Sequence, residues 1–178
     1  MSTEVAADML GAGRFALGLE EACIRYGIES PLAKAHFLAQ VAHESGGFRY
    51  TKELWGPTPA QARYEGRADL GNIRKGDGFR FRGRGLIQIT GRANYSAYSE
   101  ATYGDNRCVI APEMLEVEPD AAMCAGWFWA SRHLNIPAER DDLVRVTKTI
   151  NGGLNGLADR SKWLDKAKSA FRALGADL

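Results

Sequence analysis

Residues 35–47 read AHFLAQVAHESGG, and this stretch predicts a helix around which the rest of the chain folds. Ser30 is a residue type that commonly caps a helix N-terminus, and Pro31 suits the first helical position. Strong helix formers follow. Gly46 and Gly47 then end the run, because glycine accepts the left-handed backbone that closes a helix. We therefore expect one continuous helix from about residue 31 to residue 44.

The last turn of this predicted helix carries a carboxylic acid, Glu44. On a 3.6-residue period, Glu44 shares a stripe with Phe37 and Val41. An apolar flank disfavours a negative charge, and so does the partial negative charge at a helix C-terminus. A carboxyl group that keeps its proton near neutral pH is what general acid catalysis requires. Glu44 is therefore a candidate proton donor, although a solvated glutamate at a helix end would look the same.

Composition places the chain among ordinary globular proteins. Its 178 residues fit one domain, 1–178, with 45% apolar and 25% charged residues. The formal net charge of +1 gives no electrostatic reason to expect nucleic acid or an anionic membrane as a partner. No apolar run approaches the length of a membrane span, and residues 1–22 lack the pattern of a secretory signal. We therefore expect synthesis in the cytoplasm and a monomer.

Cysteine and histidine patterns do not predict a metal site. The three cysteines are widely spaced, which favours buried, reduced thiols: Cys23, Cys108 and Cys124. The sequence HE at 43–44 begins like a zinc-protease motif, but residue 47 is glycine where the second histidine should stand. We expect His36 and His43 to pack or to form hydrogen bonds, and we expect no metal and no cofactor.

The remaining pattern is mostly helical. Helical spacing covers 3–26, 92–102, 119–134, 141–150 and the segment from 157 onward, and Gly11 and Gly13 should break the first of these. Periodicity fades over 46–78, which predicts a long loop. The stretch FRFRGRGLIQIT at 79–90 alternates, which favours a small hairpin or a bent strand. The predicted class is mainly α (α+β), a helical domain with one small β-hairpin element.

Two carboxyl groups in separate roles are the requirement for hydrolysis of a glycosidic bond. One protonates the leaving oxygen, and the other acts as base or nucleophile. Glu44 is the candidate acid, and Glu53 and Glu65 are candidates for the second carboxylate. An inverting enzyme needs the pair roughly 6.5–9.5 Å apart to admit a water molecule. The chain after Gly47 is irregular, so either glutamate can fold back toward Glu44.

Four ordered motifs carry a family resemblance. They are HFLAQVAHESGG at 36–47, KEL at 52–54, GDGFRFRGRGLIQITGRANY at 76–95 and VTKTINGGLNG at 146–156. Together they resemble the glycoside hydrolase family 19 domain, which includes plant-type chitinases and many bacteriophage endolysins. The endolysin branch is the closer match, within one compact domain without a separate wall-binding module. The resemblance implies a lysozyme-like helical fold.

The resemblance also implies roles for particular residues. Glu44 matches the general acid, Glu53 the second glutamate of the endolysin branch, and Thr90 a hydroxyl that helps to hold the attacking water. The positions that match substrate-contacting polar residues are Gln88, Asn94 and Asn151. Glu65 matches the alternative position of the second carboxylate in plant chitinases. The amides could instead satisfy backbone groups around a turn or at a helix end.

Aromatic and basic residues near these motifs extend the predicted site. Tyr50, Trp55 and Tyr95 could stack on sugar rings, although they could equally pack in the core. A cluster of arginines beside the third motif could contact the lactyl or peptide carboxylates of peptidoglycan: Arg80, Arg82 and Arg84. Among the aromatic residues, Tyr95 is the one that we predict to bind substrate.

The resemblance predicts an endolysin, a muramidase. It would hydrolyse the β-1,4 bond between N-acetylmuramic acid and N-acetylglucosamine in peptidoglycan glycan strands, with inversion. Such a protein would be made in the host cytoplasm and would act on the periplasmic cell wall after the membrane is permeabilised. The alternatives are a chitinase acting on N-acetylglucosamine polymers, a lytic transglycosylase with one catalytic glutamate, and a non-catalytic glycan-binding protein on the same scaffold.

Overall fold

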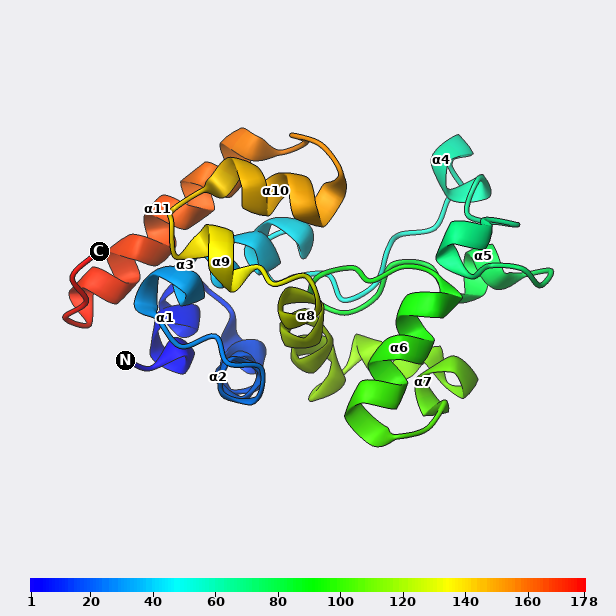
Figure 1. Ribbon diagram of the computed structural model, residues 1–178, viewed down its shortest axis with the longest axis horizontal. Coiled ribbons are helices and arrows are strands. Elements are labelled where there is room, and N and C mark those ends of the chain that lie inside the picture. The colour runs from blue at the N-terminus through cyan, green and yellow to red at the C-terminus, as the bar shows by residue number, and fades with distance from the viewer.

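The computed structural model describes residues 1–178 and consists of helices joined by loops (Figure 1). One group of helices, here called the large lobe, contains both termini: α1 (Thr3–Met9), α2 (Ala16–Arg25), α3 (Pro31–Glu44), α9 (Asn135–Ala138), α10 (Leu143–Asn151) and α11 (Leu157–Ala173). The opposite group, the small lobe, contains α4 (Pro59–Ala62), α5 (Asp77–Arg80), α6 (Arg92–Tyr103) and α7 (Arg107–Ile110). Helix α8 (Asp120–Ser131) lies between them and contacts both α2 and α6. Short 3-10 turns cover Gly13–Phe15, Ala68–Leu70 and Pro112–Glu116.

Helix α3 forms the centre of the large lobe, as its sequence predicts. The Ser30 hydroxyl caps its first turn by accepting the Ala33 N–H at 3.1 Å, and Pro31 occupies the first position. Its residues 33–42 are all buried, and its main partner is α11. A helix buried on every side has to be at the core of a domain. Gly46 and Gly47 end the helix with φ values of 61° and 76°, which few other residues adopt.

Several other sequence predictions are confirmed. The predicted helix over 3–26 is broken at Gly11 and Gly13 into α1 and α2. His36 and His43 form hydrogen bonds to aspartates, at 2.8 Å to Asp141 and 2.7 Å to Asp159 respectively. All three cysteines are buried free thiols. The mainly helical class is also confirmed, although its β element is not.

The predicted hairpin over 79–90 is wrong. Residues Asp77–Arg80 form the short helix α5, and pairing further on is limited to isolated bridges, one of which joins Arg84 and Ile89. The backbone instead makes a tight turn in which Gly85 and Gln88 have positive φ. Leu86 and Ile89 are buried in this turn, and the Leu86 N–H donates to the Ala121 carbonyl of α8. The alternating sequence of residues 79–90 therefore corresponds mainly to a turn packed into the core, not to a pair of strands.

No helix combines the length and the apolar character that crossing a bilayer requires.

Candidate active site

A cleft of about 300 Å³ lies between the lobes and brings together five of the predicted site residues. They are Glu44, Gln88, Thr90, Asn94 and Asn151. The large lobe contributes the ends of α3 and α10, and the small lobe contributes the 87–90 turn and the start of α6. Leu70, Phe128 and Arg132 complete the walls with others. Residues more than a hundred positions apart thus share one surface.

Glu44 is held by a buried guanidinium. Its side chain is 20% exposed, and Oε1 accepts a hydrogen bond from Arg160 Nη2 at 2.5 Å. Arg160, from α11, is only 2% exposed. Its Nη1 donates to Gln40 Oε1 at 2.5 Å, and its Nε donates to the Asn155 carbonyl at 3.3 Å. Gln40 lies one turn before Glu44 on α3, so one arginine fixes two successive turns of the helix.

The sequence did not predict this partner of Glu44. The expected surroundings were apolar, and Phe37 and Val41 are indeed buried, but a guanidinium also lies against the carboxylate. A signal was present in the last helix. Arg160 falls three and seven positions before Trp163 and Ala167, on the stripe that predicts the buried face of α11. A charged residue on such a stripe indicates a buried partner of opposite charge.

The 88–94 segment supplies polar groups to the cleft. Gln88 Nε2 donates to the Gly85 carbonyl at 2.9 Å, and Asn94 Nδ2 donates to the Thr90 carbonyl at 2.7 Å. The Thr90 hydroxyl donates to the Gln88 carbonyl at 3.1 Å. These amides therefore satisfy backbone carbonyls around the turn, which is the alternative role that the sequence allowed. The same contacts orient the side chains, so that the amide oxygens of Gln88 and Asn94 can accept hydrogen bonds from a glycan.

Asn151 lines the cleft from the end of α10. Its Nδ2 donates to the Asn155 carbonyl at 2.9 Å, and its Oδ1 accepts the Gly153 N–H at 2.8 Å. Both ends of the amide therefore close the turn between α10 and α11. Because that turn also carries the Asn155 carbonyl that binds Arg160, Asn151 supports the position of Glu44 indirectly, from the same lobe.

Glu53 lies beside the cleft lining, in the small lobe. Its carboxylate accepts hydrogen bonds from Gln61 Nε2 at 3.0 Å, the Gly83 N–H at 3.1 Å and the Tyr64 hydroxyl at 3.4 Å. Burial and the adjacent Glu53 raise the pKa of Tyr64, which keeps that hydroxyl a donor. A Cβ on Gly83 would lie 2.9 Å from Gln88 Oε1 and 3.4 Å from Glu53 Cβ. Glu53 and Gln88 are thus neighbours across one glycine.

Glu65 has a different environment. Its side chain is on the surface, and its two oxygens accept the N–H groups of Gly76 and Gly78 at 2.6 and 2.8 Å. It does not line the cleft. Glu65 therefore orders the glycine-containing loop that leads into α5.

Two further sequence predictions are wrong. Tyr95 is 0% exposed, its hydroxyl donates to the Arg82 carbonyl at 2.6 Å, and it therefore cannot contact a glycan. Arg84 is buried and is paired with Glu116 at 2.7 Å, so it is not available to a substrate carboxylate. Both side chains lie in the core because the turn after Arg82 folds inward against α8. Tyr50 is exposed, and Trp55 packs edge-on against Phe79.

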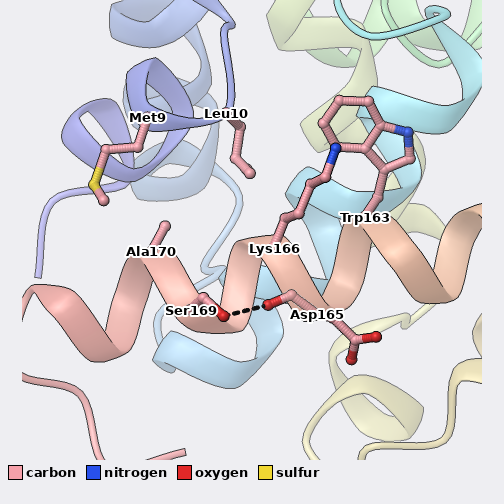
Figure 2. A pocket seen from close by; sticks show the side chains of 7 residues that line it. All are labelled: Met9, Leu10, Trp163, Asp165, Lys166, Ser169 and Ala170. Atoms are coloured by element: carbon pink, nitrogen blue, oxygen red, sulfur yellow. Dashed lines mark hydrogen bonds between the residues drawn. The ribbon is translucent and has the colours of Figure 1, made fainter.

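The largest hollow of the surface, about 550 Å³, lies away from this cleft (Figure 2). Met9 and Leu10 at the end of α1 face Trp163 and Lys166 of α11 across it. It contains none of the predicted site residues, and its lining is mainly apolar. No group of three or more histidine, cysteine, aspartate or glutamate side chains is arranged to hold a metal ion.

Comparison with known proteins decides the family. No protein-family model matches the chain. A glycosyl hydrolase family 19 domain-containing protein of Haemophilus influenzae is 36% identical over 164 residues, which covers 76% of this chain and 78% of that protein. The chain belongs to glycosyl hydrolase family 19. This family 19 protein is accordingly a glycoside hydrolase. An endochitinase of Arabidopsis thaliana is 34% identical over 121 residues, 67% of this chain but 38% of the plant protein.

Solved structures agree on the fold of this family 19 enzyme. Chitinase C from Streptomyces griseus superposes with a TM-score of 0.72 at 24% identity, over 95% of this chain and 91% of that one. A bacterial family 19 chitinase gives a TM-score of 0.69 at 21% identity, over 99% and 96% of the two chains. At these identities the likeness establishes the helical architecture and leaves the substrate to be argued from the site.

Proposed function

We propose that this family 19 enzyme is a muramidase that hydrolyses the β-1,4 bonds between N-acetylmuramic acid and N-acetylglucosamine in peptidoglycan, with inversion. The observation that carries the proposal is the cleft itself. Glu44, at the end of a buried helix, shares the cleft with the polar groups of Gln88, Thr90 and Asn94. A second glutamate, Glu53, lies next to Gln88, with Gly83 between the two side chains.

Glu44 would act as the acid. Because Arg160 occupies Oε1, Oε2 is the oxygen that can carry the proton toward the cleft. As the bond to the leaving oxygen breaks, Glu44 transfers this proton to that oxygen and becomes a carboxylate. The adjacent guanidinium then stabilises the negative charge that forms. Arg160 is itself immobilised by Gln40, so little reorganisation accompanies the step.

Glu53 would act as the base. An ionised carboxylate only accepts hydrogen bonds, and all three partners of Glu53 are donors. In an inverting reaction it takes a proton from the water whose oxygen attacks the anomeric carbon, on the face opposite the leaving group. The Thr90 hydroxyl, which lines the cleft, would help to hold that water.

The contrast between Glu53 and Glu65 supports the endolysin assignment. Glu53 adjoins the cleft residue Gln88, whereas Glu65 lies on the surface with both oxygens on backbone amides. The sequence pattern of the endolysin branch uses the glutamate at position 53, and the pattern of plant chitinases uses the later position. The lytic role, with synthesis in a host cytoplasm and access to the wall after membrane permeabilisation, is part of this proposal.

A chitinase is the second candidate, because the relatives include an endochitinase and the solved neighbours include chitinases. Parallel assays separate the two. Clearing of purified peptidoglycan, set beside release of sugars from chitin oligomers, should favour peptidoglycan. Faster turnover of chitin oligomers would reverse the assignment. Mass spectrometry of the fragments should show reducing ends, since 1,6-anhydro products would indicate a lytic transglycosylase.

Glu44→Gln tests the mechanism. A zymogram or turbidity assay should show a loss of at least about 100-fold, the usual scale for general acid catalysis. Thermal unfolding should be nearly unchanged, because the amide oxygen of the substituted side chain can still accept a hydrogen bond from Arg160. Activity equal to the wild type would exclude Glu44 as the acid.

A further inference from the structure

A basic hollow lies on the small lobe, apart from the catalytic cleft. Its volume is about 440 Å³, and its lining includes four cationic side chains and one carboxylate: Arg74, Lys75, Arg80, Arg92 and Asp77. The whole chain has a net charge of only +1. Such a concentration of positive charge in one hollow is therefore local, and it raises the concentration of anions there.

Two of the arginines are fixed in place. Arg92 forms a double contact with Asp77, Nη2 to Oδ1 at 2.5 Å and Nε to Oδ2 at 2.9 Å, and its guanidinium lies 4.5 Å from the centre of the Phe81 ring. Arg80 Nη2 donates to the carbonyls of Val109 and Ile110 at 3.1 and 2.7 Å. Cations held in this way lose little conformational entropy when an anion binds.

Charge within the hollow is only partly neutralised. The hydrogen bonds from Arg92 lower the pKa of Asp77, so that carboxylate is ionised and cancels one cation. Glu65 is the other acid nearby, and its oxygens face the N–H groups of Gly76 and Gly78. The Arg80 guanidinium is bound only to neutral carbonyls, and the exposed side chains of Arg74 and Lys75 form no ion pair, although the Arg74 N–H donates to Asp77 Oδ2 at 3.0 Å.

One wall of the hollow is aliphatic. Val109 and Ile110 form it, and Ile110 is 75% exposed. A basic surface beside an aliphatic wall fits a carboxylate carried on a short aliphatic segment better than it fits a free inorganic anion. Peptide stems of peptidoglycan have this chemistry, whereas chitin carries no charge.

The hollow and the cleft share one segment of chain. Arg92 begins α6 two residues before the cleft residue Asn94, and its N–H donates to Asn72 Oδ1 at 2.9 Å. Asn72 lies between the cleft residue Leu70 and Arg74 of the hollow. The start of α6 and residues 70–74 therefore connect the hollow to the cleft.

We propose that this hollow binds the carboxylates of peptidoglycan stem peptides and so distinguishes peptidoglycan from neutral glycans. The inference rests on the proposed muramidase function. The fixed guanidinium groups of Arg80 and Arg92 bind the anion, and the exposed side chains of Arg74 and Lys75 add further positive charge around it. Of the arginines singled out in the sequence, only Arg80 takes part.

Binding in the inactive Glu44→Gln background tests the hollow without cleavage. The test variant adds Arg74→Gln and Lys75→Gln. The control adds Arg140→Gln and Lys162→Gln, two exposed cations of the large lobe with the same change in charge. Cosedimentation with purified sacculi at low salt should show about five- to tenfold weaker binding for the test variant only, and the difference should shrink at high salt. Equal weakening of both variants would overturn the proposal, since net charge alone would explain it.

Two further ligands identify the anion. Glycan strands freed of stem peptides by an amidase should bind both variants equally. Sacculi stripped of phosphate polymers by acid should preserve the difference between the variants. Loss of the difference on that second ligand would assign the hollow to wall phosphates and overturn the stem-peptide assignment. If binding behaves as expected but the wild type cleaves only chitin oligomers, the proposed function fails while the binding site stands.

Discussion

The two lobes place their glutamates by different means. Glu44 ends a fourteen-residue helix that packs along the seventeen-residue α11, and its contact to Arg160 joins these two helices. Glu53 lies on a loop of the small lobe, where α4, α5 and α7 have four residues each. Its position depends on three individual hydrogen bonds. Glu44 is therefore fixed by the packing of two long helices, and Glu53 by a local polar network.

The largest expected effect concerns the two glutamates of the small lobe. Glu53→Gln should reduce kcat on peptidoglycan by about 100-fold or more, because it removes the proposed base. Glu65→Gln should change kcat by less than about threefold while lowering thermal stability slightly, because it weakens contacts to Gly76 and Gly78. Steady-state kinetics on the same preparation of sacculi compare the two. A larger loss for Glu65→Gln would exchange their roles.

Arg160→Met should affect both activity and stability. It leaves the Gln40 amide oxygen buried without a donor and removes the cation beside Glu44, so we expect a loss of roughly 3 kcal/mol in unfolding free energy. We expect kcat to fall at least about tenfold with little change in KM, because the charge on Glu44 develops during the reaction. Urea unfolding and kinetics measure the two effects.

Lys162→Met on the same helix is the control, because Lys162 is exposed. Arg160→Lys should restore part of the stability but little of kcat, since a single ammonium group cannot span Gln40 and Glu44 as the guanidinium does. Full activity in Arg160→Met would mean that α3 alone positions the acid.

Gly85→Ala tests how tightly the small lobe is joined to α8. A Cβ on Gly85 would lie 2.2 Å from Cys124 Sγ, and the φ of 75° is itself unfavourable for alanine. We expect a destabilisation of about 2–3 kcal/mol by urea unfolding. Gly104→Ala is the matched control, because its φ is 70° but no atom lies within 4 Å of the added Cβ. It should cost only about 1 kcal/mol, and equal losses would show that the contact with Cys124 relaxes freely.

The smallest expected effect is a dependence of stability on pH. Burial raises the pKa of Glu118 from 4.5 to about 7, with a lesser contribution from Glu21. The folded state thus holds this proton more tightly than the unfolded state, so stability is greatest below about pH 4.5 and is lost as pH rises toward 7. Melting temperatures between pH 5 and 8 should decline in the wild type and decline less in Glu118→Gln. Glu113→Gln is the control, because Glu113 is exposed. In this variant the melting temperature should fall with pH as much as in the wild type.

Local signals account for the parts of the fold that the sequence predicts. The limits of α3 follow from Ser30, Pro31 and the two glycines at 46 and 47, each of which acts within a few residues. The cleft residues follow from ordered motifs, and five of them do meet on one surface. Whether each takes its predicted part in catalysis stays a prediction for the kinetic measurements.

Long-range contacts account for the parts that the sequence did not predict. Residues 79 and 80 begin a stretch that alternates like a strand, yet they belong to α5, where Arg80 bonds to carbonyls of α7 and Glu65 orders the preceding loop. Tyr95 is buried because Arg82 and Arg84 surround its hydroxyl. These partners lie 11 to 30 positions apart, beyond the reach of periodicity.

The contact between Arg160 and Glu44 also has a consequence for the order of events during synthesis. The two residues are 116 positions apart, and the arginine belongs to the last helix of the chain. A nascent chain from which α3 has already emerged still lacks the guanidinium that holds Glu44. Glu44 therefore gains this partner only after α11 has been synthesised and has docked on α3.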